Sequence, residues 1–120
     1  MEEAVTRALA GLRTYYQTHL DLAKYMLKAY SSNMYPLDLL AVATLNRSLA
    51  LLTGFSAMIE ARNFVSAAPL LRLQLDNCLR FSASWLVSDP HDFAMKVLEG
   101  RQVRSLRDSN GKRLTDARLV

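Results

Sequence analysis

Cysteine, proline and glycine are scarce in this 120-residue chain, which contains one, three and four of them respectively. Because glycine and proline mark most turns, their scarcity favours a few long helices over many short strands. The single cysteine, Cys78, excludes an intramolecular disulfide and a cysteine-rich metal site, and it indicates a reducing compartment. The two histidines are far apart in the sequence, so we expect no metal site, and no cofactor motif is present.

A secretory signal and an uninterrupted hydrophobic run are also lacking. The chain begins Met1-Glu2-Glu3, which is acidic where a secretory signal carries positive charge. Residues 37–59 are the most apolar stretch, but it contains Asp38, Asn46 and Arg47, and Arg47 would lie near the centre of a bilayer. We therefore expect a cytoplasmic protein with no membrane partner, in which this stretch is a buried helix.

The composition that is present is typical of a globular domain. Apolar residues make up 51% of the chain and charged residues 22%, which excludes a disordered or low-complexity polypeptide. Apolar residues recur at steps of three and four between residues 2 and 30, and Ser31-Ser32-Asn33 ends that helix. A second helix is predicted over residues 36–62; it is apolar nearly all round, so we expect it to be the central and most buried element.

Two further helices follow in the sequence. Ser66 is expected to cap the third helix, with Pro69 in its first turn and an end near Val87. Asp89-Pro90 is a strong start signal for a fourth helix over residues 90–108, which Asn110-Gly111 would stop. The sequence thus predicts an all-α fold: a four-helix, mostly antiparallel bundle forming a single domain over residues 1–120.

The last residues are expected to form a short C-terminal tail. Thr115 or Asp116 could cap a further helix, but the sequence stops within its first turn. Either these residues dock as an irregular tail, or residues 1–120 are the N-terminal part of a longer protein.

The formal net charge of +4 is located entirely in the last twenty residues, because residues 1–100 are neutral. On a helix the first three arginines of that segment would form a drifting stripe able to follow a phosphate backbone. The alternative is a solvated final helix with cations near its end. The candidate nucleic-acid-binding residues are Arg101, Arg104, Arg107, Lys112 and Arg113.

Most enzyme signatures are missing, including glycine-rich phosphate loops and the Gly-x-Ser-x-Gly elbow. One loose match remains: Arg13 and His19 fit the Arg-x4-6-His pattern of the HEPN helical RNases, in which arginine steadies the phosphate and histidine transfers a proton. On a straight helix the two side chains would lie about 120° apart. They are therefore either a catalytic pair on a bent helix or polar residues on a surface helix.

A cluster of charged residues falls on the predicted third helix. Arg72, Asp76 and Arg80 are spaced four apart, so one face carries an Arg–Asp–Arg ladder beside a stripe of leucines. Charges next to so much leucine need partners if they are buried. The candidate polar network or ligand pocket comprises Arg47, Glu60, Arg62, Arg72, Asp76 and Arg80.

Several short motifs between about residues 55 and 120 resemble a family of bacterial all-helical proteins. They are Ala61-Arg62-Asn63, Pro69-Leu70-Leu71-Arg72 with Asp76, Ser88-Asp89-Pro90, and Asp108-x-Asn110-Gly111-Lys112-x-Leu114-Thr115-Asp116. That family is usually described only as a domain of unknown function, and some relatives are grouped loosely with HEPN-like or abortive-infection proteins. The resemblance implies an all-helical fold. It also implies that the relatives continue into further helix after the Leu-Thr-Asp segment.

Taken together, the sequence predicts a cytoplasmic helical domain that acts through protein–protein interaction or self-association, as a homo-oligomer. The helical stretch over residues 37–59 is apolar on every side, and three partner helices are too few to cover it. One alternative is a metal-independent HEPN-type RNase or toxin-like protein acting on RNA. A second is a nucleic-acid-binding module that uses the basic C-terminal segment.

Overall fold

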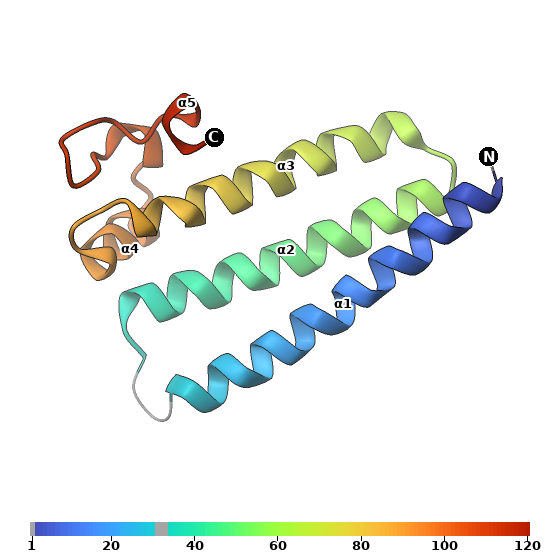
Figure 1. The fold of residues 1–120 in the computed structure, drawn as a ribbon, viewed down its shortest axis with the longest axis horizontal. Coiled ribbons are helices and arrows are strands. Elements are labelled where there is room, and N and C mark those ends of the chain that lie inside the picture. The colour runs from blue at the N-terminus through green and yellow to red at the C-terminus, as the bar shows by residue number, and fades with distance from the viewer. Residues whose placement is uncertain (1, 31–33) are drawn as a thin grey trace.

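The chain folds into an all-α bundle, as the sequence predicts (Figure 1). This computed structural model describes residues 2–30 and 34–120. Within them there is no β-strand, and the longer helices are α1 (Glu2–Tyr30), α2 (Pro36–Glu60), α3 (Phe64–Ser82) and α4 (Pro90–Leu98). The 3₁₀ turns η1 (Ala83–Trp85) and η2 (Val103–Ser105) and the short helix α5 (Asp116–Leu119) complete the secondary structure.

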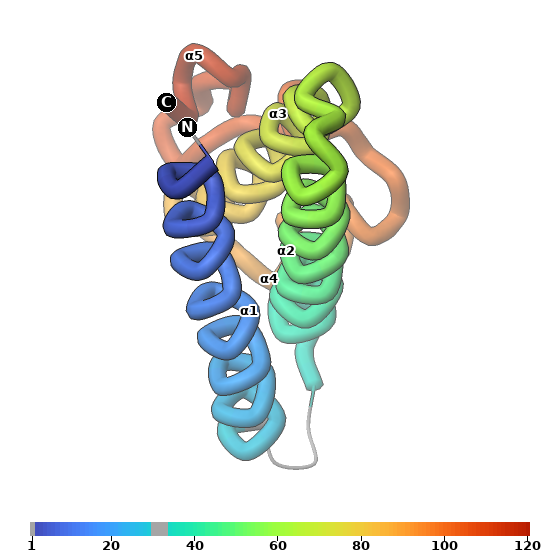
Figure 2. Tube along the Cα trace, turned by 90° about the vertical axis from the view of Figure 1, so that its right-hand side faces the viewer, coloured from blue at the N-terminus to red at the C-terminus, as the bar shows by residue number. Residues whose placement is uncertain are grey.

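The three long helices run antiparallel to their neighbours, with α2 packed against α1, α3 and α4 (Figures 1 and 2). The body measures 48 × 35 × 20 Å. Since a helix with its side chains is about 10–12 Å across, the shortest dimension holds roughly two helices. The radius of gyration is 16.4 Å, against about 14 Å for a compact domain of this length. The bundle is therefore thin and elongated.

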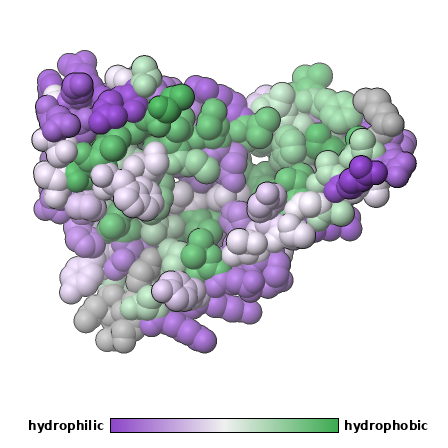
Figure 3. Space-filling view, in the orientation of Figure 1, coloured by the Kyte–Doolittle hydropathy of each residue, from purple (hydrophilic) through white to green (hydrophobic). Residues whose placement is uncertain are grey.

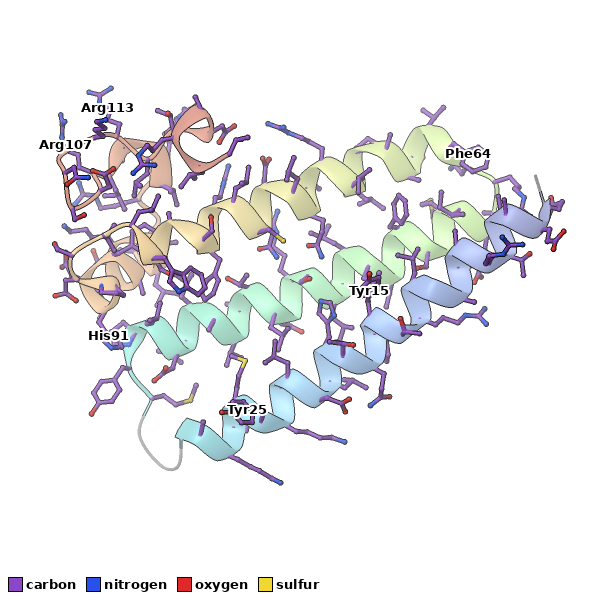
Figure 4. All side chains as sticks on the ribbon, in the orientation of Figure 1. Tyr15, Tyr25, Phe64, His91, Arg107 and Arg113 are labelled. Carbon is purple, nitrogen blue, oxygen red and sulfur yellow. The ribbon has the colours of Figure 1, made fainter. Side chains whose placement is uncertain are left out.

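The start of α2 is fixed from two directions. The predicted stop at Ser31-Ser32-Asn33 lies outside the described residues, but Pro36 begins α2 as predicted. Asp38 Oδ2 accepts the backbone N–H of Tyr35 at 2.9 Å. His91, from the start of α4, accepts the otherwise free N–H of Leu37 through Nδ1 at 3.3 Å (Figure 4). The contact fixes α4 beside the N-terminus of α2.

The turn from α2 to α3 is tighter than predicted. Helix α2 ends at Glu60 because Arg62 takes a left-handed conformation, with φ of 59°. The N–H groups of Arg62 and Asn63 donate to the carbonyls of Ile59 and Met58, which is a Schellman ending with arginine where glycine is usual. Asn63 then caps α3 by accepting the N–H of Ser66 at 3.2 Å.

Three sequence predictions for α3 are therefore wrong. Its cap is Asn63, not Ser66, because the Asn63 carboxamide reaches the N–H three residues on. Helix α3 consequently begins at Phe64, and Pro69 lies inside it, beyond the first turn. At its other end α3 stops at Ser82 and tightens into η1, short of the predicted Val87.

Helix α4 starts where predicted and ends ten residues early. Asp89 caps it through Oδ1, which accepts the N–H groups of His91 and Asp92, both at 3.1 Å. It ends at Leu98 because Gly100 has φ of 94°, and the N–H groups of Gly100 and Arg101 return to the carbonyls of Val97 and Lys96. The predicted helix over residues 99–108 is thus wrong.

The hydrophobic core lies near the C-terminus and not along α2. We call residues 99–120 the C-terminal cap; it folds over η1 and α4 in place of the expected tail. Its apolar residues and those beneath them are buried together: Ala83, Phe93, Val103, Leu106 and Leu114. Helix α2 is central, and most of its residues are half-buried, but Ser48 is its only residue that is buried, so the prediction of a buried central helix holds only in part.

Helix α2 is mostly half-buried although it is long and apolar. By length and composition it could cross a membrane, yet only 6% of its most apolar window is buried inside the chain. Within the described residues its neighbours α1, α3 and α4 cover its flanks only in part. The apolar pattern of α2 therefore finds too few partners in a single chain.

Truncating Leu114 tests whether the C-terminal cap is a packed core. Leu114 is 1% exposed, so Leu114→Ala should lower the free energy of unfolding by about 2–5 kcal/mol. The control is Val120→Ala, because Val120 is 93% exposed and its truncation should change the value by no more than about 0.5 kcal/mol. Urea unfolding followed by circular dichroism measures both. Equal effects of the two variants would contradict a packed cap.

Two glycines should respond to alanine in opposite directions. A Cβ on Gly54 would meet Leu70 Cδ1 at 3.6 Å, an ordinary contact, so Gly54→Ala should raise the free energy of unfolding by about 0.5–1 kcal/mol through helix propensity. Gly100 has φ of 94°, so Gly100→Ala should lower it by about 1 kcal/mol. Thermal unfolding of both variants shows whether each substitution raises or lowers the stability of the protein. A stabilised Gly100→Ala variant would mean that α4 continues beyond Leu98.

Candidate functional site

The six charged residues expected to form one network lie in two separate places. Glu60 and Arg62, at the α2–α3 turn, pair with α1. Arg62 Nε donates to Glu2 Oε1 at 3.1 Å and its Nη2 also pairs with the Glu2 carboxylate, while Arg13 Nη2 pairs with Glu60 at 3.4 Å. These side chains are between 39% and 78% exposed, so the pairs add little stability. They attach the start of α1 to the α2–α3 turn.

The ladder on α3 is only half formed. Arg72 Nη2 pairs with Asp76 Oδ1 at 3.5 Å, as the four-residue spacing predicts. The same guanidinium pairs with Asp116 of α5 at 3.4 Å, which joins α3 to the C-terminal cap. No ion pair joins Asp76 to Arg80 in the described part of the chain. The ladder is therefore one arginine holding two aspartates, with Arg80 outside it.

Arg80 instead faces a cavity of about 240 Å³ between α2, α3 and α4. Arg47 of α2 lines the same cavity, so the structure brings these two predicted residues together. Asn77 Nδ2 donates to the carbonyl of Thr44 at 3.1 Å, which fixes α3 to α2 along the cavity. Apolar side chains from the three helices form the remaining walls: Leu40, Ala43, Leu73, Phe81 and Val97.

A second cavity, of about 490 Å³, adjoins the C-terminal cap and shares Arg80 with the first. Arg104 and Asp116 line it together with backbone and apolar groups of the cap. Arg104 Nε donates to Gln102 Oε1 at 3.0 Å, and Arg104 forms no ion pair with the described residues. Arg80 thus stands between the two cavities, with one further arginine on each side.

Arg13 and His19 bind different partners in the structure, and no hydrogen bond joins them within the described residues. Arg13 pairs with Glu60, whereas both ring nitrogens of His19 are occupied. His19 Nδ1 lies 2.7 Å from the carbonyl of Tyr15, which can only accept, so Nδ1 is the donor. In the neutral ring Nε2 then accepts from the Ser48 hydroxyl at 2.6 Å.

Ser48 joins three helices through this contact. Its hydroxyl oxygen also accepts from Gln74 Nε2 at 2.5 Å, so a chain of hydrogen bonds crosses from α1 through α2 to α3. Among the described residues, Gln74 Oε1 is the one buried side-chain nitrogen or oxygen atom without a hydrogen-bond partner. Ser48 and Gln74 are not among the site residues predicted from the sequence. A small polar residue within the apolar α2 helix was the available signal for Ser48.

The basic C-terminal segment is not a helical stripe. Arg101 follows the Gly100 reversal, Arg104 lies in η2, and Arg107 forms an isolated antiparallel bridge with Arg113. Arg107 Nη1 donates to the carbonyl of Gly111 at 2.9 Å. The predicted stripe is wrong because α4 ends at Leu98. Arg107 and Arg113 project outward from one compact turn, as Figure 4 shows, and Lys112 is exposed beside them.

That turn is built around Asp108, a residue the sequence analysis did not single out for chemistry. Asp108 Oδ1 accepts the N–H groups of Asn110 and Lys112, each at 2.9 Å, and Oδ2 accepts from Arg118 Nε at 3.0 Å. The Lys112 and Asn110 N–H groups and the Arg118 guanidinium lower the pKa of Asp108, although burial acts in the opposite direction. The Asx-turn pattern Asp108-x-Asn110-Gly111 was the signal that could have identified it.

Comparison of the chain with protein-family models, curated proteins and solved structures found no match. The residues that the structure describes contain no group of three or more His, Cys, Asp or Glu placed to hold a metal ion. The cavities, the charges and the exposed apolar surface of this chain are therefore the features that bear on its function.

Replacing Asp108 should destabilise the protein in a pH-dependent manner. The folded-state pKa of Asp108 is lowered. Its carboxylate therefore contributes fully to the free energy of unfolding above the ordinary aspartate pKa of about 3.9, and this contribution is lost as the pH falls through the lower folded-state pKa. Asp108→Asn should therefore lower the melting temperature at neutral pH, and the gap from the unaltered protein should close in acid.

Thermal unfolding between neutral pH and acid measures the difference in melting temperature between Asp108→Asn and the unaltered protein. The control is Asp21→Asn, at an exposed position. Asp21 accepts only a surface hydrogen bond from Gln17, so its replacement should leave the melting temperature nearly unchanged at each pH. If the melting temperature of Asp108→Asn stayed below that of the unaltered protein by the same amount in acid, the destabilisation would come from altered packing or hydrogen bonding and not from the lost charge.

Proposed function

We propose that this chain is a helical interaction domain that self-associates, with a second copy of itself covering the apolar face of α1 and α2. The single observation that supports the proposal is the area left exposed. The chain exposes 8156 Å². The size scaling for compact monomers gives about 6,500 Å² for 13.5 kDa, so roughly 1,600 Å² of surface is in excess.

That excess is the amount of surface a stable dimer covers. Obligate homodimers bury about 2,000–5,000 Å² in total, or about half of that per chain. An excess of roughly 1,600 Å² per chain lies within this range. Large apolar residues contribute much of the exposed surface, including Leu22, Tyr25 and Leu27 of α1. Figure 3 shows apolar atoms in bands across one broad face of the molecule.

The α1–α2 groove is the apolar depression into which a partner helix fits. It has a volume of about 360 Å³ and lies between the second half of α1 and the first half of α2. Its walls are mainly apolar, with Leu27 and Leu39 at 62% and 47% exposure beside the less exposed Met26 and Val42. Ridges of one helix pack into such grooves of another. A twofold pairing would place α1 of each copy on the groove of the other.

A second copy accounts for this face better than a lipid bilayer does. Although α2 has the length and apolar composition to span a membrane, Asn46, Arg47 and Ser48 occupy its middle. A central arginine costs about 2.5–3.5 kcal/mol or more in a bilayer, whereas at a protein interface its guanidinium can stay in water. We therefore propose that the partner is a second copy of this chain.

The mass in solution is the direct test. Light scattering should give twice the chain mass of 13.5 kDa. The double variant Leu27→Glu, Leu39→Glu places two carboxylates in the groove and should raise the dissociation constant at least about 100-fold, because unpaired charges resist burial. Circular dichroism should show unchanged helix content.

Val65→Glu is the matched control. Val65 is 86% exposed on α3 and does not line the groove, so this variant should keep the dimer mass. An unaltered protein that has the mass of one chain at every concentration would refute the proposal. Flotation of that single chain with neutral phosphatidylcholine vesicles would show that lipid covers the face instead.

A further inference from the structure

We propose that Arg47 and Arg80 form a binding site for a small amphipathic anion, with a carboxylate or phosphate-monoester head and a short hydrocarbon body. The two arginines come from neighbouring helices and line one cavity. Neither forms an ion pair or a hydrogen bond with the other described residues, whereas Arg7, Arg13 and Arg62 each pair with a glutamate.

The nearby carboxylates do not neutralise this pair. Asp76 is the only acidic residue that lines the first cavity, and Asp116 is the only one that lines the second. Arg72, which lines neither, pairs with both of them, at 3.5 and 3.4 Å. Because one arginine engages both aspartates, Arg47 and Arg80 keep their charge available for an external anion.

The chemistry of the walls defines the rest of the ligand. Leu40, Leu73, Phe81 and Val97 give the first cavity a largely apolar lining away from the two arginines. Its volume of about 240 Å³ is below the range of about 300–1,000 Å³ that holds drug-sized molecules. Guanidinium groups bind carboxylates and phosphates through paired N–H donors. A short alkyl chain with one anionic head group fits both the apolar walls and the two arginines of the cavity.

Isothermal titration with octanoate and octyl phosphate, each below its micellar concentration, tests the site. Both head groups present oxyanions to arginine, so either or both should bind, and binding should weaken as salt is added. Octanol carries the same chain without charge and should bind at least about tenfold more weakly. Binding of octanoate alone would identify a carboxylate site, and binding of octyl phosphate alone a phosphate site.

Conservative variants separate this site from general charge effects. Arg47→Gln and Arg80→Gln should each weaken binding about tenfold or more. Arg7→Gln removes the same charge from an exposed residue of α1 that pairs with Glu3, and it should bind like the unaltered protein. The only tryptophan, Trp85, packs edge-on against Phe81 with ring centroids 5.4 Å apart, so its fluorescence should change on binding.

Three results would overturn the inference. Octanol binding as tightly as octanoate would show an apolar cavity without an anion site. Equal losses in Arg7→Gln and in the two cavity variants would show unspecific charge attraction. Unchanged affinity in both cavity variants, with helix content intact, would place the ligand elsewhere. These results remain distinguishable from the dimer test, because Leu27 and Leu39 do not line this cavity, although Ala43 lines both the cavity and the α1–α2 groove.

Discussion

The structure depends on how little apolar surface three long helices can bury when they pack as a thin bundle. A body 20 Å thick in its shortest direction leaves two broad faces open to solvent. Hydrophobic stabilisation grows with the area removed from water, and within α2 only Ser48 is buried. The free energy available from the apolar residues of α1 and α2 is therefore only partly realised inside one chain, which is the basis of the proposed self-association.

The C-terminal cap buries its apolar residues by a different route. Its backbone is mostly irregular, and buried N–H groups outside helices need acceptors. Asp108 supplies them for Asn110 and Lys112 while Arg118 balances its charge. With the backbone satisfied, Leu106 and Leu114 can pack on Phe93. A single buried carboxylate thus permits a compact core in a segment with almost no regular secondary structure.

The sequence was sufficient to predict the helices and several of their ends, because these depend on neighbouring residues. Pro36 and the Asp89-Pro90 pair start α2 and α4 as predicted. The errors arose where two local signals compete, as Asn63 and Ser66 do for the cap of α3, or where glycine reverses the chain, as Gly100 does. Periodicity showed that α2 needs many neighbours but not whether the chain supplies them.

The candidate site shows the same division between local and distant contacts. The pairing of Arg72 with Asp76 follows from their spacing, but its second partner, Asp116, lies 44 residues away in the sequence. No local pattern could show that Arg80 would turn to a cavity it shares with Arg47.

The surroundings of Arg72 and Arg80 depend on the folding of the C-terminal cap. Asp116 reaches Arg72 only because Leu114, two residues earlier, is fixed in the core. Without the docked cap, Arg72 would retain Asp76 alone, and Arg80 would lose the wall that Leu114 and Leu119 provide in the second cavity. The turn around Asp108 therefore acts at a distance on α3: by placing Leu114 and Asp116, it gives Arg72 its second carboxylate and supplies a wall of the second cavity beside Arg80.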